Sequence, residues 1–181
     1  MKCKDIIAKI EEKYPVSFAE SWDNSGFLAG DASWEVRKVF LALDATDEVI
    51  DAAIECEADM IITHHPLIFA GMKRVTADDF IGRRIIKMLQ NNICYYAMHT
   101  NFDVLGMAEL SADYLQLSNR EVLEITYEDN MNREGIGRCG KLTTPMTLEE
   151  CGKFVKEQLH LPFVQIYGDE NKVIENLAVC T

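Results

Sequence analysis

The sequence has few of the features that would direct it into a membrane or out of the cell. Its longest apolar runs contain about ten residues, whereas a membrane-spanning helix needs about 20. The N-terminal segment, MKCKDIIAKIEEKYP, is charged throughout and lacks the apolar centre and small-residue cleavage site of a signal peptide. We therefore expect a cytoplasmic protein with no membrane partner.

Paired cysteines are also absent. Each of the six cysteines stands alone, none forms a CxxC pair, and most lie within apolar runs. This distribution argues against a disulfide framework and against a zinc knuckle, and it predicts reduced, buried thiols. A catalytic cysteine is the weaker alternative, because nothing near any of them predicts an activated thiolate.

Positive charge is scarce. The chain has 18 lysines and arginines against 30 aspartates and glutamates, so its formal net charge is −12. Such a charge repels a phosphate backbone and argues against general nucleic-acid binding, although a bound cation would still attract an anionic substrate. With 181 residues, 48% of them hydrophobic and 27% charged, the chain has the composition of a folded globular protein with a sizeable core.

The sequence does contain a regular alternation of helical and strand-like segments. Apolar spacing predicts helices over 3–14, 80–92 and 107–117, a further helix after Thr46 whose apolar stripe runs from Val49 to Ile54, and strands over 37–46, 59–63 and 93–99. Thr46 is a candidate cap for the second helix, since Asp47 and Glu48 follow it. Strands separated by such helices imply right-handed crossovers and a largely parallel sheet, so the predicted class is α/β.

The pattern of helical and strand-like segments changes after about residue 120. Two strand-like runs flank a polar loop, and a capping box from Thr147 to Glu150 then opens a further helix. The segment FVQIYGDENKVIENLAVCT predicts two more strands joined by a Gly-Asp-Glu turn. We therefore expect two parts: an α/β domain over 1–120 and a second, smaller α/β subdomain over 121–181.

Polar side chains gather where the predicted strands end, at Asp44, His64, His65, His99 and Asp103. Parallel sheets bind ligands beyond the carboxyl ends of their strands. Imidazole is the commonest side-chain metal ligand, and a carboxylate can bridge two cations that together activate a water. This pattern predicts a metal-binding cleft. The alternative is a solvated turn in which one imidazole faces the core.

Six segments sharpen this interpretation: SWDNSGFLAGD, ALDAT, ITHHPLIF, HTNFDV, GIGRCGKL and NLAVC, in that order. They resemble the NIF-three-like dinuclear metal-binding family, whose members are often labelled GTP cyclohydrolase 1 type 2 homologues. The resemblance covers essentially the whole chain, and ITHHP together with HTNFD is specific to the family. It implies a mostly parallel sheet flanked by helices, a second smaller α/β subdomain, and assembly as a ring-shaped homohexamer with metal sites facing an internal cavity.

The resemblance also implies roles for individual residues. His64, His65 and Asp103 match the family's metal ligands, which makes residues 1–120 the first half of a metal-binding domain. His99 is implied to neighbour the metal, where it would orient a ligand or meet substrate, and it is our candidate catalytic residue. Histidine with carboxylate suits zinc, iron, manganese or nickel, so the sequence does not select one divalent ion.

Four further residues have two interpretations each. For Trp22, Asp23 and Asn24 we expect a turn with a buried indole, and the alternative is a wall of the metal cleft. Asp44 is interpreted either as a hydrogen-bonding partner near the metal or as a residue at the entry of the following helix.

One part of the family pattern has no counterpart in this chain. The family closes its site with a C-terminal histidine and glutamate, and none of His160, Glu170 and Glu175 stands in the matching context. The chain is then either a fragment or a truncated member whose site is open or completed by another chain. With fewer carboxylates to offset two close cations, we expect at most one tightly bound ion.

Three functions are consistent with these observations. The first is a metal-dependent hydrolase of the cyclohydrolase or phosphoester type, acting on a small phosphorylated or nucleotide-like substrate, with His99 as the proton shuttle. The second is a non-catalytic metal-binding or regulatory protein that assembles as a ring, and the third is an interaction scaffold. We expect at least a dimer, because a sheet lacking its final elements leaves apolar surface or an unpaired edge.

Overall fold

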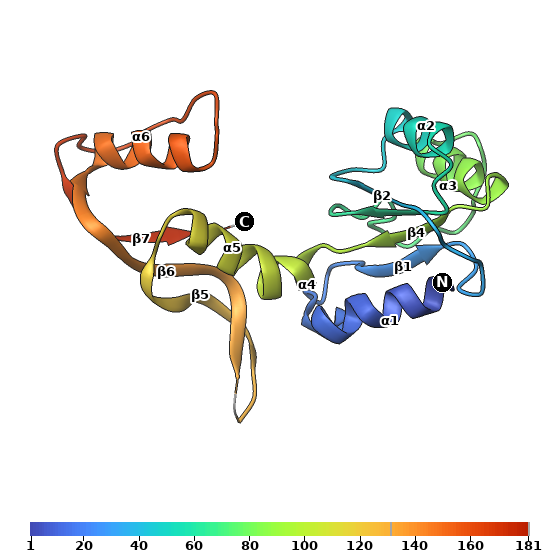
Figure 1. Cartoon of the computed structure of the whole chain (residues 1–181), viewed down its shortest axis with the longest axis horizontal. Coiled ribbons are helices and arrows are strands. Elements are labelled where there is room, and N and C mark those ends of the chain that lie inside the picture. Colours follow the sequence, from blue (N-terminus) through green and yellow to red (C-terminus); the bar gives the residue numbers. More distant parts are fainter. Residues whose placement is uncertain (131, 181) are drawn as a thin grey trace. The chain divides into compact units, whose positions relative to one another are not determined.

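The computed structural model of the 181-residue chain describes residues 1–130 and 132–180 (Figure 1). The chain divides into two compact units, 1–102 and 103–181. The change of sequence pattern near residue 120 lies inside a strand of the second unit, β5 (Ser118–Glu128). The division comes earlier because helix α5 (Ala108–Tyr114) packs on a strand of the second unit, β6 (Arg133–Thr147).

The first unit is built on a four-stranded, mostly parallel sheet. Its strands are β1 (Gly26–Ala29), β2 (Val39–Ala42), β3 (Met60–Thr63) and β4 (Cys94–Ala97), in the order β1-β4-β3-β2. Strands β2, β3 and β4 are parallel, and only β1 runs antiparallel to its neighbour. The α/β class with a parallel-rich sheet is therefore confirmed, although each strand is shorter than the apolar run that predicted it.

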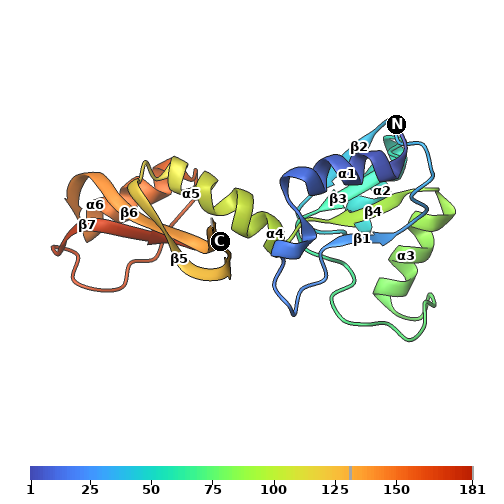
Figure 2. The same cartoon turned by 90° about the horizontal axis from the view of Figure 1, so that it is seen from below.

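Helices cover both faces of this sheet (Figures 1 and 2). On one face, α2 (Asp47–Glu55) and α3 (Phe80–Gln90) pack on Ile61 and Tyr95, whereas on the other α1 (Cys3–Lys13) packs near Met60, Cys94 and Tyr96. Successive strand residues point to opposite faces, so Tyr95 and Tyr96 enter two different cores. Both are fully buried.

Both crossover helices begin with a capped N-terminus. The Thr46 side chain accepts a hydrogen bond from the Val49 amide at 3.2 Å, as the sequence predicted, and Asp79 accepts one from the Gly82 amide at 2.9 Å. Such caps satisfy amides that have no partner within the helix, and each stabilises the fold by about 1 kcal/mol. The caps therefore fix where each crossover leaves the sheet. None of the described helices is long and apolar enough to cross a membrane.

Strand β2 lies at the edge of the sheet and pairs only with β3 among the described strands. Leu41 and Leu43, in and just after β2, are 73% and 60% exposed. An edge strand with exposed apolar side chains is a surface on which other chains can pair. This edge differs from the one that we expected, which belongs to the sheet with the C-terminal strand, and self-association stays a prediction.

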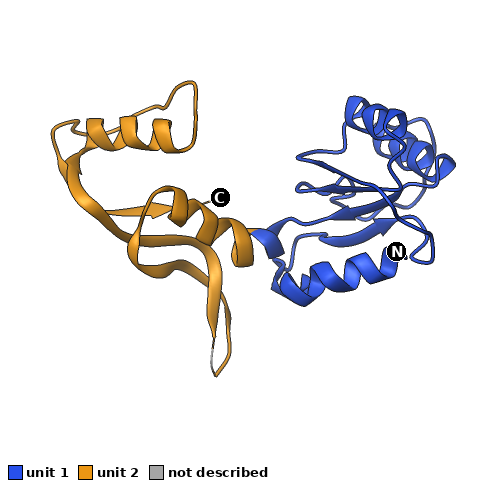
Figure 3. Cartoon of the chain, in the orientation of Figure 1, with its two compact units in different colours: residues 1–102 blue, residues 103–181 orange. Residues whose placement is uncertain are grey.

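The second unit is a three-stranded antiparallel sheet with two helices (Figure 3). Its strand order is β5-β6-β7, where β7 is Val173–Val179. Helix α6 (Leu148–Gln158) starts with the predicted capping box, in which Thr147 and Glu150 exchange hydrogen bonds of 2.8 and 3.2 Å. One expected strand is wrong: residues 163–167 are irregular, with Phe163 71% and Tyr167 83% exposed, because no described strand pairs with them.

The cysteines are not uniformly buried, in contrast to our expectation. Cys3, Cys94 and Cys151 are buried, Cys56 and Cys139 are partly buried, and Cys180 is exposed. Burial raises the pKa of the Cys3 thiol to about 12 and that of Cys94 above its ordinary value. These two thiols are therefore protonated at neutral pH and behave as small apolar side chains.

The core of the first unit makes a direct stability prediction. Ile61 is fully buried at the centre of the sheet, so Ile61→Ala removes packing that the surrounding side chains cannot replace. We expect urea unfolding to show a loss of roughly 2 to 5 kcal/mol. Val75→Ala, at a half-exposed position in the loop before α3, is the control and should change stability by less than about 0.5 kcal/mol. Equal losses in both variants would contradict the assignment of the core.

Candidate metal centre

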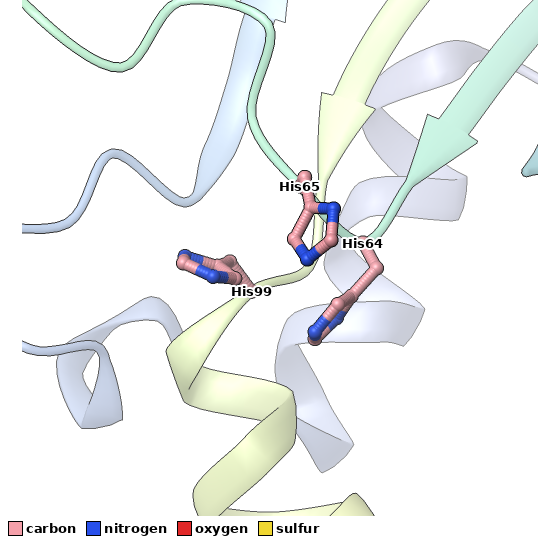
Figure 4. Close-up of side chains that lie close together, drawn as sticks. All are labelled: His64, His65 and His99. Carbon is pink, nitrogen blue, oxygen red and sulfur yellow. The ribbon is translucent and has the colours of Figure 1, made fainter. Parts of the chain in front are cut away.

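Three histidines meet at the carboxyl ends of two neighbouring strands. His64 and His65 directly follow β3, and His99 lies just beyond the end of β4 (Figure 4). One nitrogen from each ring lies within 4.8 Å of the others, and the ring centroids are 4.9 to 5.6 Å apart. The structure therefore brings together the three histidines that the sequence placed at strand ends.

The ring nitrogens on the outer side of this cluster already have partners. Each Nδ1 atom lies 2.8 Å from an oxygen: Met98 O for His64, Asp44 Oδ1 for His65 and Asp23 Oδ1 for His99. Carbonyl and carboxylate oxygens accept hydrogen bonds, so each neutral ring places its proton on Nδ1. The lone pair is then on Nε2, the atom with which such oriented histidines bind metals.

Asp23 is the most strongly held of these partners. Its side chain is fully buried, and besides His99 it accepts hydrogen bonds from Ser25 Oγ at 2.7 Å and from Thr100 Oγ1 at 2.6 Å. Burial alone would raise the pKa of this carboxyl, but the hydrogen bonds from Thr100, His99 and Ser25 outweigh it and lower the pKa to about 2. His99 is therefore backed by a fixed negative charge.

The expectation of a buried indole at Trp22 is wrong. Trp22 is 56% exposed, and its ring lies 6.0 Å from Phe69 and 6.1 Å from His99, centroid to centroid. The next two residues, which are polar, point into the unit instead. Asp23 accepts a hydrogen bond from His99, and the side-chain amide of Asn24 donates one to Ile68 O at 2.5 Å. The polar side chains of this turn point towards the interior of the unit. This arrangement agrees with the alternative interpretation, in which the turn forms a wall beside the histidines.

Asp44 takes the first of its two proposed roles. Thr46, not Asp44, caps α2, and the Asp44 carboxylate accepts the hydrogen bond of His65. About half of each side chain in this pair is exposed, in contrast to the fully buried Asp23 beside His99. Sequence reasoning gave Asp23 no individual role; the only available signal was a carboxylate followed by short polar residues just before a strand.

Asp103 and His160 lie in the other compact unit. Asp103 is the first residue of a π-helical turn, Asp103–Met107, and is 7% exposed. Its role as a ligand beside the histidines stays a prediction. His160 is exposed, follows α6 and has a φ of +53°. It is not part of the histidine cluster.

The histidine cluster fits a divalent metal ion. Zinc–nitrogen bonds of 2.0 to 2.1 Å in tetrahedral geometry separate the ligand nitrogens by about 3.3 Å. Nitrogens already within 4.8 Å of one another reach that spacing by small rotations of the side chains. His65 is exposed and the other two rings are partly buried, so an ion can enter from solvent. Neutral imidazoles suit zinc, iron and nickel, and carboxylates extend the range to manganese.

An α/β unit with such a cluster at its strand ends defines a class of candidate metal-binding proteins, and comparison with known proteins supplies the family. The model described as Duf34/NIF3 (NGG1p interacting factor 3) matches residues 1–181, so the chain belongs to this family. A "GTP cyclohydrolase 1 type 2 homolog" of Clostridium perfringens is 37% identical over 181 residues, which cover 99% of this chain and 68% of that protein. The resemblance noted in the sequence is therefore confirmed.

Solved structures agree with the fold. A Bacillus cereus protein related to NIF3 has a TM-score of 0.90 at 25% identity, over 99% of this chain and 76% of that one. A hypothetical protein of Staphylococcus aureus has a TM-score of 0.87 at 31% identity, over 99% and 71% of the two chains. The NIF-three-like fold is thus confirmed, and this chain spans about two thirds to three quarters of these proteins.

The depressed pKa of Asp23 predicts a pH dependence of stability in the metal-free chain. This carboxyl has an ordinary pKa of 3.8 and a folded-state pKa of about 2, so it stabilises the fold above pH 4 and loses that effect as the pH falls towards 2. The difference corresponds to roughly 2 kcal/mol. Urea unfolding with a chelator present should show that deficit for Asp23→Asn at pH 7, shrinking towards pH 2. Asp78→Asn, at an exposed site, is the control, and a deficit independent of pH would contradict the assignment.

Proposed function

We propose that the chain binds a divalent metal ion at the histidine cluster and acts as a metal-dependent hydrolase. The observation that carries the proposal is the convergence of the three rings: one nitrogen each from His64, His65 and His99 lies within 4.8 Å of the others, while every Nδ1 lies 2.8 Å from an oxygen. His64 and His65 are the proposed ligands. Asp103 is the carboxylate ligand that the family resemblance implies.

His99 is the residue on which the choice of function depends. Its Nε2 has a single lone pair, which can bind the ion or accept a proton but not both at once. The fully buried, ionised Asp23 behind it stabilises a positively charged ring, as the aspartate of a catalytic triad does for its histidine. His64 is backed only by a carbonyl, and His65 by a half-exposed carboxylate. We therefore assign proton transfer to His99.

The proposed chemistry is hydrolysis of a small phosphorylated or nucleotide-like molecule. The metal, when bound, lowers the pKa of a water and offsets negative charge on the substrate. His64 and His65 would hold the ion beyond the carboxyl ends of β3 and β4, and His99 would take a proton from the attacking water on Nε2 and pass it to the leaving group. Relatives named GTP cyclohydrolase 1 type 2 homologs support a nucleotide as the first substrate to test.

A non-catalytic metal-binding protein is the second candidate function. In that case His99 would be the third metal ligand and not a base, which the same cluster geometry also supports. An interaction scaffold without metal is the third. Metal content separates the scaffold from the other two, and the effect of His99→Ala separates the hydrolase from the metal-binding protein.

Metal content of single-histidine variants tests the proposal. By plasma mass spectrometry we expect at most one divalent ion per purified chain, since two close cations need more carboxylate than this cluster offers. His64→Ala and His65→Ala should each weaken binding at least tenfold, as loss of a direct ligand requires. His160→Ala, outside the cluster, is the matched control and should bind as the parent chain does. Equal loss in all three histidine variants would contradict the site.

Hydrolysis assays complete the test. His99→Ala should keep most of its metal but lose hydrolysis of GTP or of a generic phosphodiester by about 10²-fold or more, because removing a general base has that effect. Loss of metal equal to that of His64→Ala would show that His99 is a ligand and would favour the non-catalytic function. Absence of metal from the parent chain after zinc addition would leave the scaffold.

We also propose that the chain self-associates, with the homohexamer implied by the family resemblance as the expected form. The exposed apolar edge at β2 supports this proposal, since Leu41 and Leu43 offer apolar surface that a second chain can cover. Light scattering should give a mass at least twice the 20.6 kDa of one chain. A mass of 20.6 kDa that persists at high concentration would contradict it.

A further inference from the structure

One buried hydroxyl reaches the turn that carries the histidine pair. Tyr95 lies in β4, is fully buried, and its Oη is 2.7 Å from Thr63 Oγ1 and 3.2 Å from His65 O. The Leu67 amide donates to the same Oη at 2.8 Å, and Thr63 Oγ1 donates to His65 O at 2.7 Å. Two side chains from adjacent strands thus bind the backbone on both sides of Pro66.

These contacts form an ordered chain of donors. Each hydroxyl has one proton, so a consistent arrangement runs from the Leu67 amide to Tyr95 Oη, from Tyr95 to Thr63 Oγ1, and from Thr63 to His65 O. Pro66 has no amide proton, and its ring fixes its φ. The backbone of the turn therefore cannot donate a hydrogen bond at that position. Without the Tyr95 hydroxyl, the partly buried Leu67 amide next to the histidine pair loses its partner.

We propose that Tyr95 is a positioning residue for the metal centre. Its hydroxyl fixes the His65–Leu67 backbone and thereby sets the direction in which the His64 and His65 rings point. The inference rests on the proposed function, because metal affinity is what depends on this alignment. Ligand atoms must lie within about 0.2 Å of their ideal distances for tight binding, so a small movement of the turn weakens the site.

Tyr96 provides an internal comparison. It is the next residue in β4 and is also fully buried, but it points to the other face, where its hydroxyl donates to Glu11 Oε1 at 3.1 Å. Its hydrogen bond fixes α1 instead of the histidine turn. Neither change to phenylalanine creates a cavity, since the ring is kept: Tyr95→Phe loses the contacts with Thr63, His65 and Leu67, and Tyr96→Phe loses the bond to Glu11. Of the two tyrosine hydroxyls, that of Tyr95 bonds to the backbone between His65 and Leu67.

Tyr95→Phe and Tyr96→Phe in the full chain separate positioning from general stability. Competition with a chromogenic chelator measures affinity for Zn²⁺ alone. We expect Tyr95→Phe to weaken zinc binding about tenfold or more, the usual effect of losing a group that orients a ligand. Tyr96→Phe should lower the unfolding temperature to a similar extent but leave zinc affinity within about twofold of the parent chain. A zinc affinity that falls equally in both variants, or in neither, would overturn the inference.

Thr63 supplies a rescue experiment. Thr63→Val keeps the shape of the side chain but removes the hydrogen bond from Thr63 to His65 O, which leaves that carbonyl only the longer bond from Tyr95, so zinc affinity should fall, but by less than in Tyr95→Phe. Thr63→Ser keeps the hydroxyl and should restore most of the affinity. Failure of serine to restore it would show that side-chain packing, and not the hydroxyl, controls the turn, and would count against Tyr95 as well.

A metal-independent readout keeps the two proposals apart. In the metal-free chain, hydrogen exchange of the Leu67 amide should be faster in Tyr95→Phe than in the parent chain, and unchanged in Tyr96→Phe. Tight zinc binding by the parent with no difference in Tyr95→Phe would overturn the positioning role alone. Absence of zinc binding by the parent would overturn the proposed function, and with it the metal-positioning role. Unchanged exchange at Leu67 would overturn the contact that the inference depends on.

Discussion

The candidate site depends on the register between two parallel strands. Thr63 of β3 pairs with Ala97 of β4, so both strands end at the same level of the sheet. The Met98 amide continues the pairing to Thr63 O at 2.9 Å, and the Met98 carbonyl accepts the His64 ring at 2.8 Å. A slip of one residue would turn each side chain to the opposite face. The cores on both faces, which bury Tyr95 and Tyr96 completely, therefore also fix the histidines.

The electrostatics of the site are asymmetric, and this asymmetry gives the rings different roles. Asp23 is buried, ionised and bound by several donors, so it neither moves nor gains a proton near neutral pH. Asp44 is half exposed and bound by His65. A fixed buried charge behind one ring favours proton transfer there, whereas the other two rings need only present a lone pair. The chain can thus combine metal binding and acid–base chemistry within one small cluster.

Much of the first unit could be predicted from the sequence, because its signals are local. Helical apolar spacing, the cap at Thr46 and the strand-end positions of His64, His65 and His99 all follow from residues near one another in the chain. The partnership of Asp23 with His99 could not, because it joins distant segments through a turn. Residues 163–167 were wrongly predicted for the opposite reason. Their alternating apolar and polar side chains are typical of a strand, but a strand forms only where another strand can pair with it. The division at residue 102 likewise depends on where α5 packs.

The central claim is that each ring carries its proton on Nδ1 and offers Nε2 to a ligand. Long-range proton–nitrogen correlation spectra of the histidine side chains test it directly, in the metal-free chain and after one equivalent of Zn²⁺. The account predicts protonated Nδ1 in His64, His65 and His99 before zinc is added. It then predicts that zinc shifts the Nε2 resonances of His64 and His65 while leaving His160 unchanged. Protonated Nε2 atoms in the free chain, or zinc-induced shifts at Nδ1, would contradict it.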